Sequence, residues 1–368
     1  MQPMVRVVDA RLGPSAQVRV VVSGIDEPEP LRAAWASSGA AVEVFDGRLT
    51  AVSTVAALAR AAGRALDPTT ASQLRQAAER AVAAWTSPTP PWQLPGGAEL
   101  DLSERPAVMG VLNVTPDSFA DGGQVYPEGH PAAAVAKGRA QAAAGAAIID
   151  VGGESARPGS MPIAVDEELR RVVPVVEALA AEGHMVSVDT VKPEVARQAV
   201  QAGAALVNDV GAGSPDMLET VAGLGCGYVL MHTRGTPADM HEHTDYADVV
   251  AEVYERQWAD LDRCLAAGIP REGIVLDPGI GFAKTATQSA ALVAAVPQLR
   301  SLGRPVLVGA SRKSFLGALL DGAPVEERLE GSLAVAAVAA VDRAGIVRAH
   351  DVGETVRTIR VAAALRKA

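Results

Sequence analysis

The chain has 368 residues, of which 49% are hydrophobic and only 3% aromatic, so it can bury a large core that must be mainly aliphatic. Its formal net charge of −10 argues against unspecific binding to nucleic acid or to an anionic membrane, because both need a cationic surface. No apolar run is long enough for a signal peptide or a membrane-spanning helix, so we expect a cytoplasmic protein with neither nucleic acid nor membrane as partner.

Residues 1–85 predict a small α/β appendage. Strands are expected at Val5–Val8, Val18–Val22 and Val42–Phe45, and helices at Val52–Leu66 and Thr70–Trp85, the second capped by Thr69 or Thr70. The region holds no catalytic constellation, so we expect a packing or oligomerisation role, with regulation or partner binding as the alternative. The prolines and glycines of residues 86–105 predict a linker or an irregular lead-in.

Residues 106–368 contain eight short apolar runs that alternate with helical patterns. The runs are Val108–Leu112, Ala147–Val151, Met185–Val188, Ala205–Val207, Tyr228–Met231, Ile274–Leu276, Val306–Val308 and Ile346–Arg348. Such runs are typical of strands buried on both faces of a parallel sheet. Among the helices, Asp245–Ala267 is the clearest. Eight such units predict an α/β fold, a (β/α)8 TIM barrel with a small α/β N-terminal extension; a doubly wound open sheet is the alternative.

A polar or charged residue stands at or just after the end of each predicted strand, where a barrel places its active site. These positions include Asn113, Glu154, Asp189, Asn208, His232, Asp277, Lys313, Arg348 and His350. The carboxylates and the amide at positions 189, 208 and 277 suit the edge of a flat, nitrogen-rich heterocycle. Lys313, Arg348 and His350 suit a phosphate group, and the amide oxygen of Asn113 suits Mg²⁺, which leaves its other positions to phosphate and water.

Two long segments on the same rim, residues 113–130 and 152–165, show little regular pattern and predict lids that close over a substrate and exclude water. Plainer interpretations stand beside several of these residues. They are Asp189 as a helix cap, Asp277 as part of a turn, Glu154 as a loop support, Arg170 and Arg171 as an exposed helix face, and His241 and His243 as solvated side chains. Cys226 and Cys264 are expected to be buried thiols.

Seven longer segments follow the strands in order. They are MGVLNVTPDSFADGG from Met109, IIDVGGESARPGS from Ile148, VSVDTVKPEVARQAVQAGAALVNDV from Val186, LMHTRGTP from Leu230, LDPGIGFAKT from Leu276, VGASRKSFLG from Val308 and VRAHDV from Val347. In this combination they resemble the dihydropteroate synthase family of pterin-binding barrels, from about Trp92 to the end of the chain. The combination is highly specific, although no single motif is.

The resemblance implies a transferase that joins 6-hydroxymethyl-7,8-dihydropterin pyrophosphate to p-aminobenzoate in folate biosynthesis. Pyrophosphate leaves in an SN1-like reaction, and 7,8-dihydropteroate forms. The resemblance also implies Mg²⁺ at Asn113, a homodimer and inhibition by sulfonamides. It assigns the pterin to Asp189, Asn208, Met231, Asp277 and Lys313, and the pyrophosphate to Asn113, Arg157, Arg348 and His350. It assigns p-aminobenzoate to Phe119, Ala156, Arg157, Pro158, Phe282 and Ser311, and catalysis to Asp121, Lys313, Arg348 and His350.

Three positions depart from the family pattern: Ala156 stands where Thr or Ser is usual, Thr233 where Met is common, and Ala283 where Gly is common. The hydroxyl missing at Ala156 removes one neutral hydrogen bond, worth on the order of 1 kcal/mol, so we expect weaker binding of p-aminobenzoate and sulfonamides rather than lost activity. The alternatives are a methyltetrahydrofolate–corrinoid methyltransferase on a related barrel and a non-catalytic pterin-binding paralogue. The VTPDSF loop and the SRK motif favour the synthase, because methyl transfer needs no pyrophosphate site.

Overall fold

The computed structural model describes residues 4–10, 18–23, 25, 27–45, 48–94, 97–115, 131–155 and 160–367. The chain forms two compact units. One consists of Met1–Pro88 with Pro297–Gly303, and the other of Thr89–Val296 with Arg304–Ala368.

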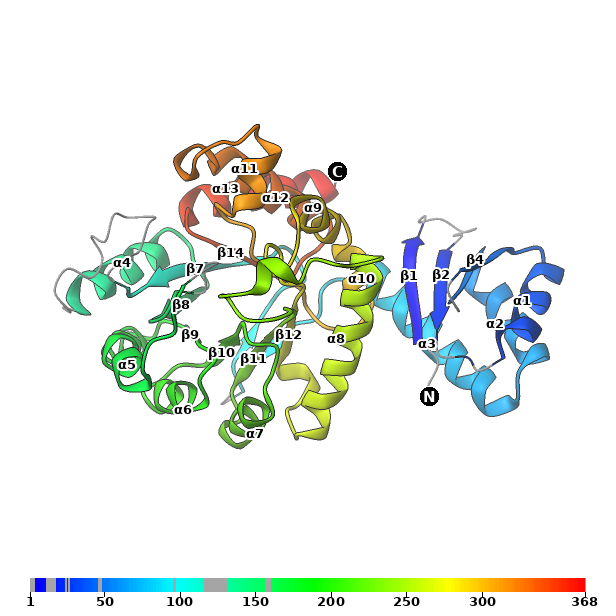
Figure 1. Ribbon diagram of the computed structural model, residues 1–368, viewed down its shortest axis with the longest axis horizontal. Helices are drawn as coiled ribbons and strands as arrows, with labels where there is room; N and C mark the ends of the chain where they lie inside the picture. Colours follow the sequence, from blue (N-terminus) through cyan, green and yellow to red (C-terminus); the bar gives the residue numbers. More distant parts are fainter. Residues whose placement is uncertain are drawn as a thin grey trace. The chain divides into compact units, whose positions relative to one another are not determined.

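The first unit, blue to cyan in Figure 1, is a four-stranded antiparallel sheet covered by helices. Its strands, in the order β1-β2-β4-β3, are β1 (Met4–Ala10), β2 (Val18–Ser23), β3 (Ala41–Phe45) and β4 (Arg48–Ser53), and its helices are α1 (Pro28–Ser37), α2 (Val55–Ala65) and α3 (Pro68–Thr86). Alternate residues of β2 are buried in a core that includes Trp35 of α1 and Leu58 of α2. The indole Nε1 of Trp35 donates to the carbonyl of Leu58 at 2.9 Å, so the buried polar atom is paired.

Two elements of this unit were not predicted. Helix α1 was missed because its prolines suggest a break, although Pro28 stands at the first helical position, where no N–H donor is needed. Strand β4 was missed because Val52 and Ser53 were assigned to the following helix. That helix starts only at Val55.

The two helix starts expected here were also wrong. The side chain of Thr54 caps α2 by accepting from the amide of Ala57, so the chain leaves the sheet there. Helix α3 is capped by Asp67 rather than by Thr69 or Thr70. The Asp67 carboxylate accepts from both of their amides at 3.0 Å.

The second unit is an eight-stranded parallel barrel, which confirms the predicted fold class. Its strands are β7 (Ala107–Asn113), β8 (Ile148–Gly152), β9 (Val186–Asp189), β10 (Leu206–Asp209), β11 (Gly227–Met231), β12 (Ile274–Asp277), β13 (Leu307–Val308) and β14 (Ile346–Ala349). Each predicted run coincides with one strand. A parallel bridge between Leu276 and Val306, with a 3.0 Å hydrogen bond from the Leu276 amide to the Pro305 carbonyl, joins β12 to the segment that enters β13. The sheet therefore closes on itself, and the open doubly wound alternative is wrong.

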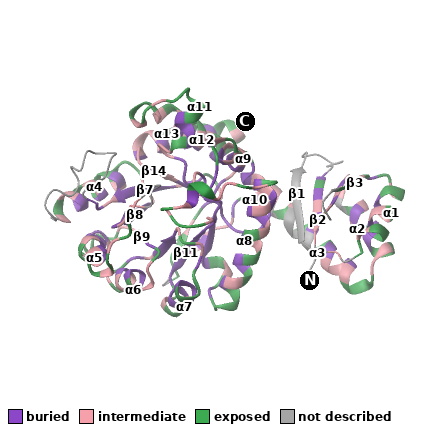
Figure 2. Ribbon diagram, in the orientation of Figure 1, coloured by how far each residue is buried: buried purple, intermediate pink, exposed green. Residues whose placement is uncertain are grey.

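Helices surround this barrel, and the strands between them are buried (Figures 1 and 2). They are α4 (Pro131–Ala143), α5 (Val165–Ala181), α6 (Pro193–Gln201), α7 (Pro215–Leu224), α8 (Val249–Ala266), α9 (Ala286–Ala294), α11 (Ser314–Leu319), α12 (Leu329–Val341) and α13 (Val352–Lys367). Helix α10 (Val296–Arg300) belongs, except for its first residue, to the first unit. Helix α8 begins later than the expected Asp245, because the Asp248 side chain caps it by accepting from the amides of Val250 and Ala251. Over the described ranges, no helix combines the length and the apolarity that a membrane crossing needs.

A short hairpin covers the amino end of the barrel strands. Strand β5 (Trp92–Gln93) pairs with β6 (Glu99–Leu100) within the stretch where we expected a linker or an irregular lead-in. Trp92 and Leu102 are fully buried there, and the Trp92 indole donates to the carbonyl of Gly273 at 2.8 Å. They pack on the first residues of the strands, including Met109, Ile148, Leu206, Val229, Val275, Leu307 and Ile346. The opposite, carboxyl end of the strands holds the polar residues described next.

Candidate active site

Arg348 connects three strands at the carboxyl end of the barrel. From β14, its Nε donates to Oδ2 of Asp150 and its Nη2 to Oδ2 of Asp189, both at 2.6 Å. Asn208, in β10, donates its Nδ2 to the same Asp150 oxygen at 3.0 Å. Three residues expected at the site therefore do lie together. The interpretation of Asp189 as a helix cap is wrong, because α6 begins after Lys192 and has no side-chain cap.

Asp150 completes this group, and it was not predicted as a site residue. It is fully buried within β8 between Ile149 and Val151, so it does not stand at a strand end. Its Oδ1 atom is buried and has no hydrogen-bond partner in the part of the chain that the structure describes. The available signal was a single charge inside an otherwise apolar strand, since alternate strand residues point into the barrel.

The charges of this group are strongly coupled. Burial raises the pKa of Asp189 to about 7 against the opposing effect of Arg348, and the charge of Asp150 adds to the rise. Burial acts to lower the pKa of Arg348, but Asp150 and Asp189 outweigh burial, and the pKa is raised. Arg348 therefore stays a cation, while Asp189 changes charge close to neutral pH.

A second charged pair, Asp277 and Lys313, belongs to the same site. A Cβ atom at Gly309 would lie 3.8 Å from Oδ2 of Asp277 and 3.9 Å from Cβ of Arg348, so this glycine separates the two groups without filling the space. Burial raises the pKa of Asp277, and Lys313 opposes the rise. Burial also lowers the pKa of Lys313 to about 8, and Asp277 opposes that shift.

Asp277 also takes part in a turn, as its plainer interpretation held. Its Oδ1 accepts from the amide of Gly279 at 2.7 Å, which leaves Oδ2 on the side of the site. Met231 stands beside it, because the two residues are register partners in β11 and β12, and Met231 is buried. The buried side chain of Gln257 in α8 donates to the Asp277 carbonyl at 2.7 Å and fixes the strand end from outside.

The loops after β13 and β14 bring Ser311 and His350 together. The Ser311 hydroxyl oxygen accepts from the His350 amide at 3.1 Å and lies 3.0 Å from Nδ1 of His350. Arg312, between Ser311 and Lys313, has a φ of +58° and places its guanidinium against Asp351, with Nε to Oδ2 at 2.9 Å. The SRK motif thus divides its side chains between His350, Asp351 and the Ile280 carbonyl, which accepts from Lys313 at 2.5 Å.

Asn113 ends β7 on the same rim. A Cβ atom at Gly152 would lie 3.7 Å from Oδ1 of Asn113 and 3.8 Å from Oδ2 of Asp189, so the two oxygens flank the space that this glycine leaves open. Within the described ranges, no three His, Cys, Asp or Glu side chains come together as metal ligands. His241 and His243 lie near Glu242 and Asp239 instead, at 3.7 and 3.6 Å, and their side chains are exposed.

Five residues expected at the site lie outside the described residues: Phe119, Asp121, Ala156, Arg157 and Pro158. They belong to the two long segments predicted as lids. Their assignments to the p-aminobenzoate and pyrophosphate positions stay predictions.

Glu154 lies in a buried network at the foot of the second long segment. Its Oε2 accepts from the amide of Ile163 at 2.8 Å and from Nζ of Lys192 at 2.5 Å. The same Nζ donates to Glu168, which in turn accepts from the hydroxyl of Thr190 at 2.6 Å. These contacts support Glu154 as a loop support, the plainer of its two interpretations.

The neighbouring residues Arg170 and Arg171 differ in exposure. The side chain of Arg170 is 74% exposed, as expected, whereas that of Arg171 is only 12% exposed. Arg171 donates to the Gly153 carbonyl at 2.9 Å and to Glu167 at 2.8 Å, so its interpretation as a solvated residue was wrong. Cys226 and Cys264 are buried and unpaired, as predicted.

The fold and this strand-end site define an enzyme of the pterin-binding class. The family model of pterin binding enzymes matches residues 109–350. A dihydropteroate synthase of Escherichia coli K12 is 48% identical over 267 residues, which are 72% of this chain and 93% of that protein. The crystal structure of the Yersinia pestis dihydropteroate synthase with a sulfonamide drug complex has 42% identity and a TM-score of 0.72 over 76% of this chain and all of that one.

A structure of the Xanthomonas albilineans dihydropteroate synthase with 4-aminobenzoic acid has 43% identity and a TM-score of 0.69, and covers 76% of this chain and 99% of that one. The chain therefore belongs to the dihydropteroate synthases, transferases of folate biosynthesis that bind pterins. This membership favours the synthase over the corrinoid methyltransferase that was its alternative.

Proposed function

We propose that the strand ends bind 6-hydroxymethyl-7,8-dihydropterin pyrophosphate by its ring on one side and by its pyrophosphate on the other. Asp189, Asn208, Asp277 and Lys313, with Met231 beside them, bind the ring. The observation that carries this assignment is the buried, unpaired Oδ1 of Asp150 next to Asn208 and Arg348. Buried acceptors are nearly always paired, and the edge of a pterin is rich in N–H donors.

The pyrophosphate takes the cationic side of the site in this proposal. Arg348 has five N–H donors in a planar fork, and its contacts with Asp150 and Asp189 leave others for an anion. His350, Asn113 and Arg157 complete the set. Arg348 and His350 stabilise the charge that develops when the bond between the pterin methylene carbon and the pyrophosphate oxygen breaks and its electron pair leaves with pyrophosphate.

The arylamine of p-aminobenzoate then forms the new C–N bond to the methylene cation and loses a proton. Asp121 stabilises the cation, and Phe119, Ala156, Arg157, Pro158, Phe282 and Ser311 hold the arylamine. Sulfonamides occupy the same position. Because a neutral arylamine is already nucleophilic, the reaction needs no strong base and no covalent enzyme intermediate.

Mg²⁺ fits the donor set at Asn113. The neighbouring oxygens are one amide and the Asp189 carboxylate, and the described residues offer no larger group of metal ligands. Mg²⁺ is commonly held by one or two protein oxygens together with substrate phosphates and water. When bound, it supplies positive charge to the pyrophosphate. Asn113 is the residue that we propose to hold it.

A homodimer and a cytoplasmic location complete the proposal. Exposed apolar side chains gather on three consecutive helices, namely Leu319, Val338, Val341, Val361 and Leu365 of α11, α12 and α13. Helix α12 (LEGSLAVAAVAAV) is apolar on nearly all sides, a pattern typical of a helix covered on both faces. The two buried free thiols suit a reducing compartment.

Release of pyrophosphate, measured with both substrates and with each alone, tests the reaction. We expect release and 7,8-dihydropteroate formation only when p-aminobenzoate and the pterin pyrophosphate are both present. Genetic complementation of a folate-synthesis mutant gives the same answer in a cell. Soluble, folded protein that neither releases pyrophosphate nor complements would contradict the proposal.

A further inference from the structure

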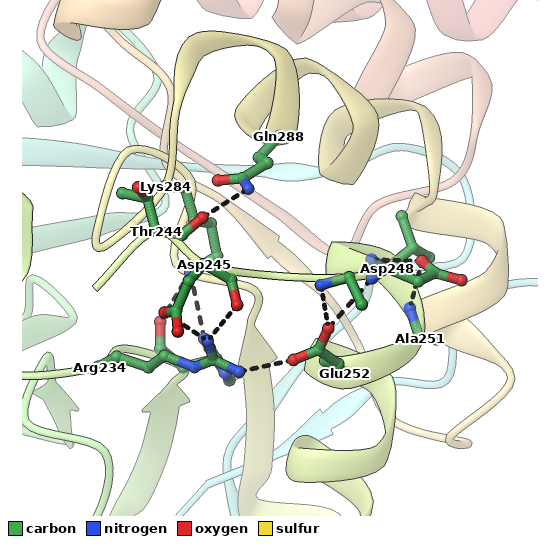
Figure 3. A network of polar contacts seen from close by, with 11 residues as sticks. Arg234, Thr244, Asp245, Asp248, Ala251, Glu252, Lys284 and Gln288 are labelled. Carbon is green, nitrogen blue, oxygen red and sulfur yellow. Dashed lines mark hydrogen bonds and ion pairs between the residues drawn. The ribbon is translucent and has the colours of Figure 1, made fainter. Parts of the chain in front are cut away.

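Two rim loops meet beside Asp277. One runs from His232 to Asp248, between β11 and α8, and the other from Pro278 to Thr285, between β12 and α9. Figure 3 shows their outer contacts, with Arg234 between Asp245 and Glu252 and with Gln288 reaching the first loop. The side chain of Gln288 donates to the Thr244 carbonyl at 2.8 Å. The guanidinium of Arg234 stacks 3.8 Å from the ring centre of Tyr246 and donates to Glu252 at 2.7 Å.

Lys284 makes the inner contact between these loops, and the sequence analysis gave it no role. Its Nζ donates to the Phe282 carbonyl at 2.8 Å and lies 3.1 Å from Nδ1 and 3.5 Å from the carbonyl oxygen of His232. The Lys284 side chain is buried, and within the described ranges no carboxylate forms an ion pair with it. Burial lowers the pKa of His232 to about 2, so its imidazole is neutral and can accept from the lysine.

The backbone φ angle alternates between negative and positive values in the residues just before Lys284. Gly279, Gly281 and Ala283 have φ values of +68°, +79° and +50°. The carbonyls of Ile280 and Phe282 each precede a left-handed residue, and each accepts from a lysine, Ile280 from the partly buried Lys313 and Phe282 from the buried Lys284. A Cβ atom at Gly279 would lie 1.8 Å from the His232 carbonyl oxygen, so the loops approach as closely as their backbones allow. Two lysines thus hold one short turn by two of its carbonyls, at Ile280 and Phe282.

This turn carries Phe282, whose ring centre lies 4.5 Å from Nζ of Lys313. The carbonyl that Lys284 binds belongs to Phe282 itself, so the contact fixes the peptide from which the ring projects. Burial lowers the pKa of Lys284 to about 7, but its amine donates N–H hydrogen bonds in either charge state. From one atom it reaches both the Phe282 carbonyl and His232, which a planar guanidinium cannot do in the same space.

We propose that Lys284 is a positioning residue for the arylamine substrate. It does not touch the substrate, but it holds the Phe282 carbonyl and thereby orients the Phe282 ring beneath Lys313. The inference rests on the proposed placement of p-aminobenzoate at Phe282. It explains why a buried lysine lies in this turn in a chain that uses 33 basic residues, almost all of them arginine.

Lys284→Met, Phe282→Ala and the double variant test this role. Gln288→Ala is the control, because it removes a contact between α9 and the first loop that does not involve Phe282. We expect Lys284→Met to raise KM for p-aminobenzoate, and the Kd of a sulfonamide, about tenfold, the effect of losing one hydrogen bond that positions the Phe282 peptide. KM for the pterin pyrophosphate stays the same. Gln288→Ala leaves both KM values unchanged, and Lys284→Arg recovers part of the loss.

The double variant separates positioning from general support. Because Lys284 acts through Phe282, Lys284→Met should add nothing in the Phe282→Ala background. Effects that multiply in the double variant, or equal rises in both KM values, would overturn the role of Lys284. If Lys284→Met does not give soluble protein, Lys284→Gln replaces it, with the same expectations for both KM values and for the double variant.

The assignment of the arylamine site to Phe282 is tested independently of the role of Lys284. If Phe282→Ala itself leaves KM for p-aminobenzoate unchanged, the assignment of that pocket is wrong. If Phe282→Ala raises KM and Lys284→Met does not, the positioning role of Lys284 is wrong and the pocket stands.

Discussion

Lys313 is a point charge in a site where an arginine would make different contacts. Its Nζ approaches the Ile280 carbonyl at 2.5 Å and lies over the Phe282 ring, and burial lowers its pKa to about 8, with Asp277 opposing. A guanidinium is wider and needs more partners. We expect Lys313→Ala to abolish turnover and Lys313→Arg to lower kcat/KM on the order of a hundredfold, as for the loss of one group that stabilises developing charge. Steady-state assays check this, and near-normal activity of the arginine variant would contradict the assigned role.

The protonation state of Asp189 affects the stability of the folded protein. Its pKa is raised by burial to about 7, so the folded state holds the proton more tightly than the unfolded state. Ionisation of Asp189 therefore lowers the stability of the folded protein as pH rises from about 4 toward 7. Below the pKa of the unfolded state the carboxyl is protonated in both states, so it has no such effect there. We expect Asp189→Asn to be more stable than the wild type at about pH 8, by on the order of 1 kcal/mol, and equally stable near pH 4.

Chemical unfolding at the two pH values measures this difference. Asp262→Asn, on the exposed face of α8, is the control and should show the same small effect at both. An Asp189→Asn protein that is less stable than the wild type at the higher pH would show that the Arg348 contact outweighs burial.

Ala283 stands in the left-handed region with a φ of +50°, at a position where glycine is common in the family. For an L-residue with a Cβ atom this conformation costs roughly 1 kcal/mol, whereas glycine adopts it freely. We expect Ala283→Gly to raise the free energy of unfolding by up to about 1 kcal/mol, less the added entropy of the unfolded chain. Denaturant unfolding measures it. A clear loss of stability would mean that the Ala283 side chain makes contacts worth more than the strain.

At the scale of elements, we propose that the apolar surface of α11, α12 and α13 is the dimer interface. Val361 and Leu365 of α13 are 60% and 70% exposed, and a charge at either position is incompatible with a buried interface. We expect the wild type to have the mass of a dimer in light scattering and Val361→Glu with Leu365→Glu to have that of a monomer. Val44→Glu, at an exposed valine of the first unit, is the control and should leave the mass unchanged. A wild-type monomer would contradict the dimer.

The sequence predicted the strands and their polar ends because each depends on local pattern. An apolar run of three or four residues followed by Asp189 or Asp277 carries its position and its direction in the chain itself. The sequence did not predict which of these side chains contact one another. Asp150 contacts Arg348 across 198 positions, and Lys284 contacts His232 across 52, and neither pairing has a local signature.

The missed boundaries have local causes of their own. In α3, Asp67 is the cap instead of either threonine, since its carboxylate, two residues before Thr69, accepts from the amides of both Thr69 and Thr70. In β4, Val52 and Ser53 fit a strand and a helix equally well by composition, and pairing with β2 and β3 decided between them. Tertiary contacts determined the element boundaries that residue propensities alone did not.

At the scale of the whole molecule, one cut after Pro88 removes all of the first unit except Pro297–Gly303. The barrel unit begins at Thr89, whose hydroxyl donates to the Arg343 carbonyl at 2.7 Å, and the base hairpin follows. We expect a protein without residues 1–88 to fold and to keep kcat/KM within about twofold, because the strand-end site lies in the other unit. It should unfold at lower denaturant concentration, because Arg300 loses its 2.8 Å contact with the Ser87 carbonyl.

A longer deletion, through residue 94, is the control. It removes Trp92 and Leu94 from the base of the barrel, where both are buried, and should yield insoluble protein. Activity and unfolding of the two truncated proteins are the measurements. Collapse of the shorter deletion would show that the first unit is required for the barrel to fold.

The pairing of Arg348 with Asp150 and Asp189 also affects the ligand selectivity of the unliganded enzyme. Cells are full of free phosphates and nucleotides, and a bare arginine in a cleft would capture them. Here the arginine is electrically balanced until a ring occupies Asp189. In the proposed function, a heterocycle that takes over the contact with Asp189 frees a further N–H of Arg348 for the anion attached to its other end. We therefore expect metabolites that carry only the anion to compete poorly with a substrate that carries both the ring and the anion.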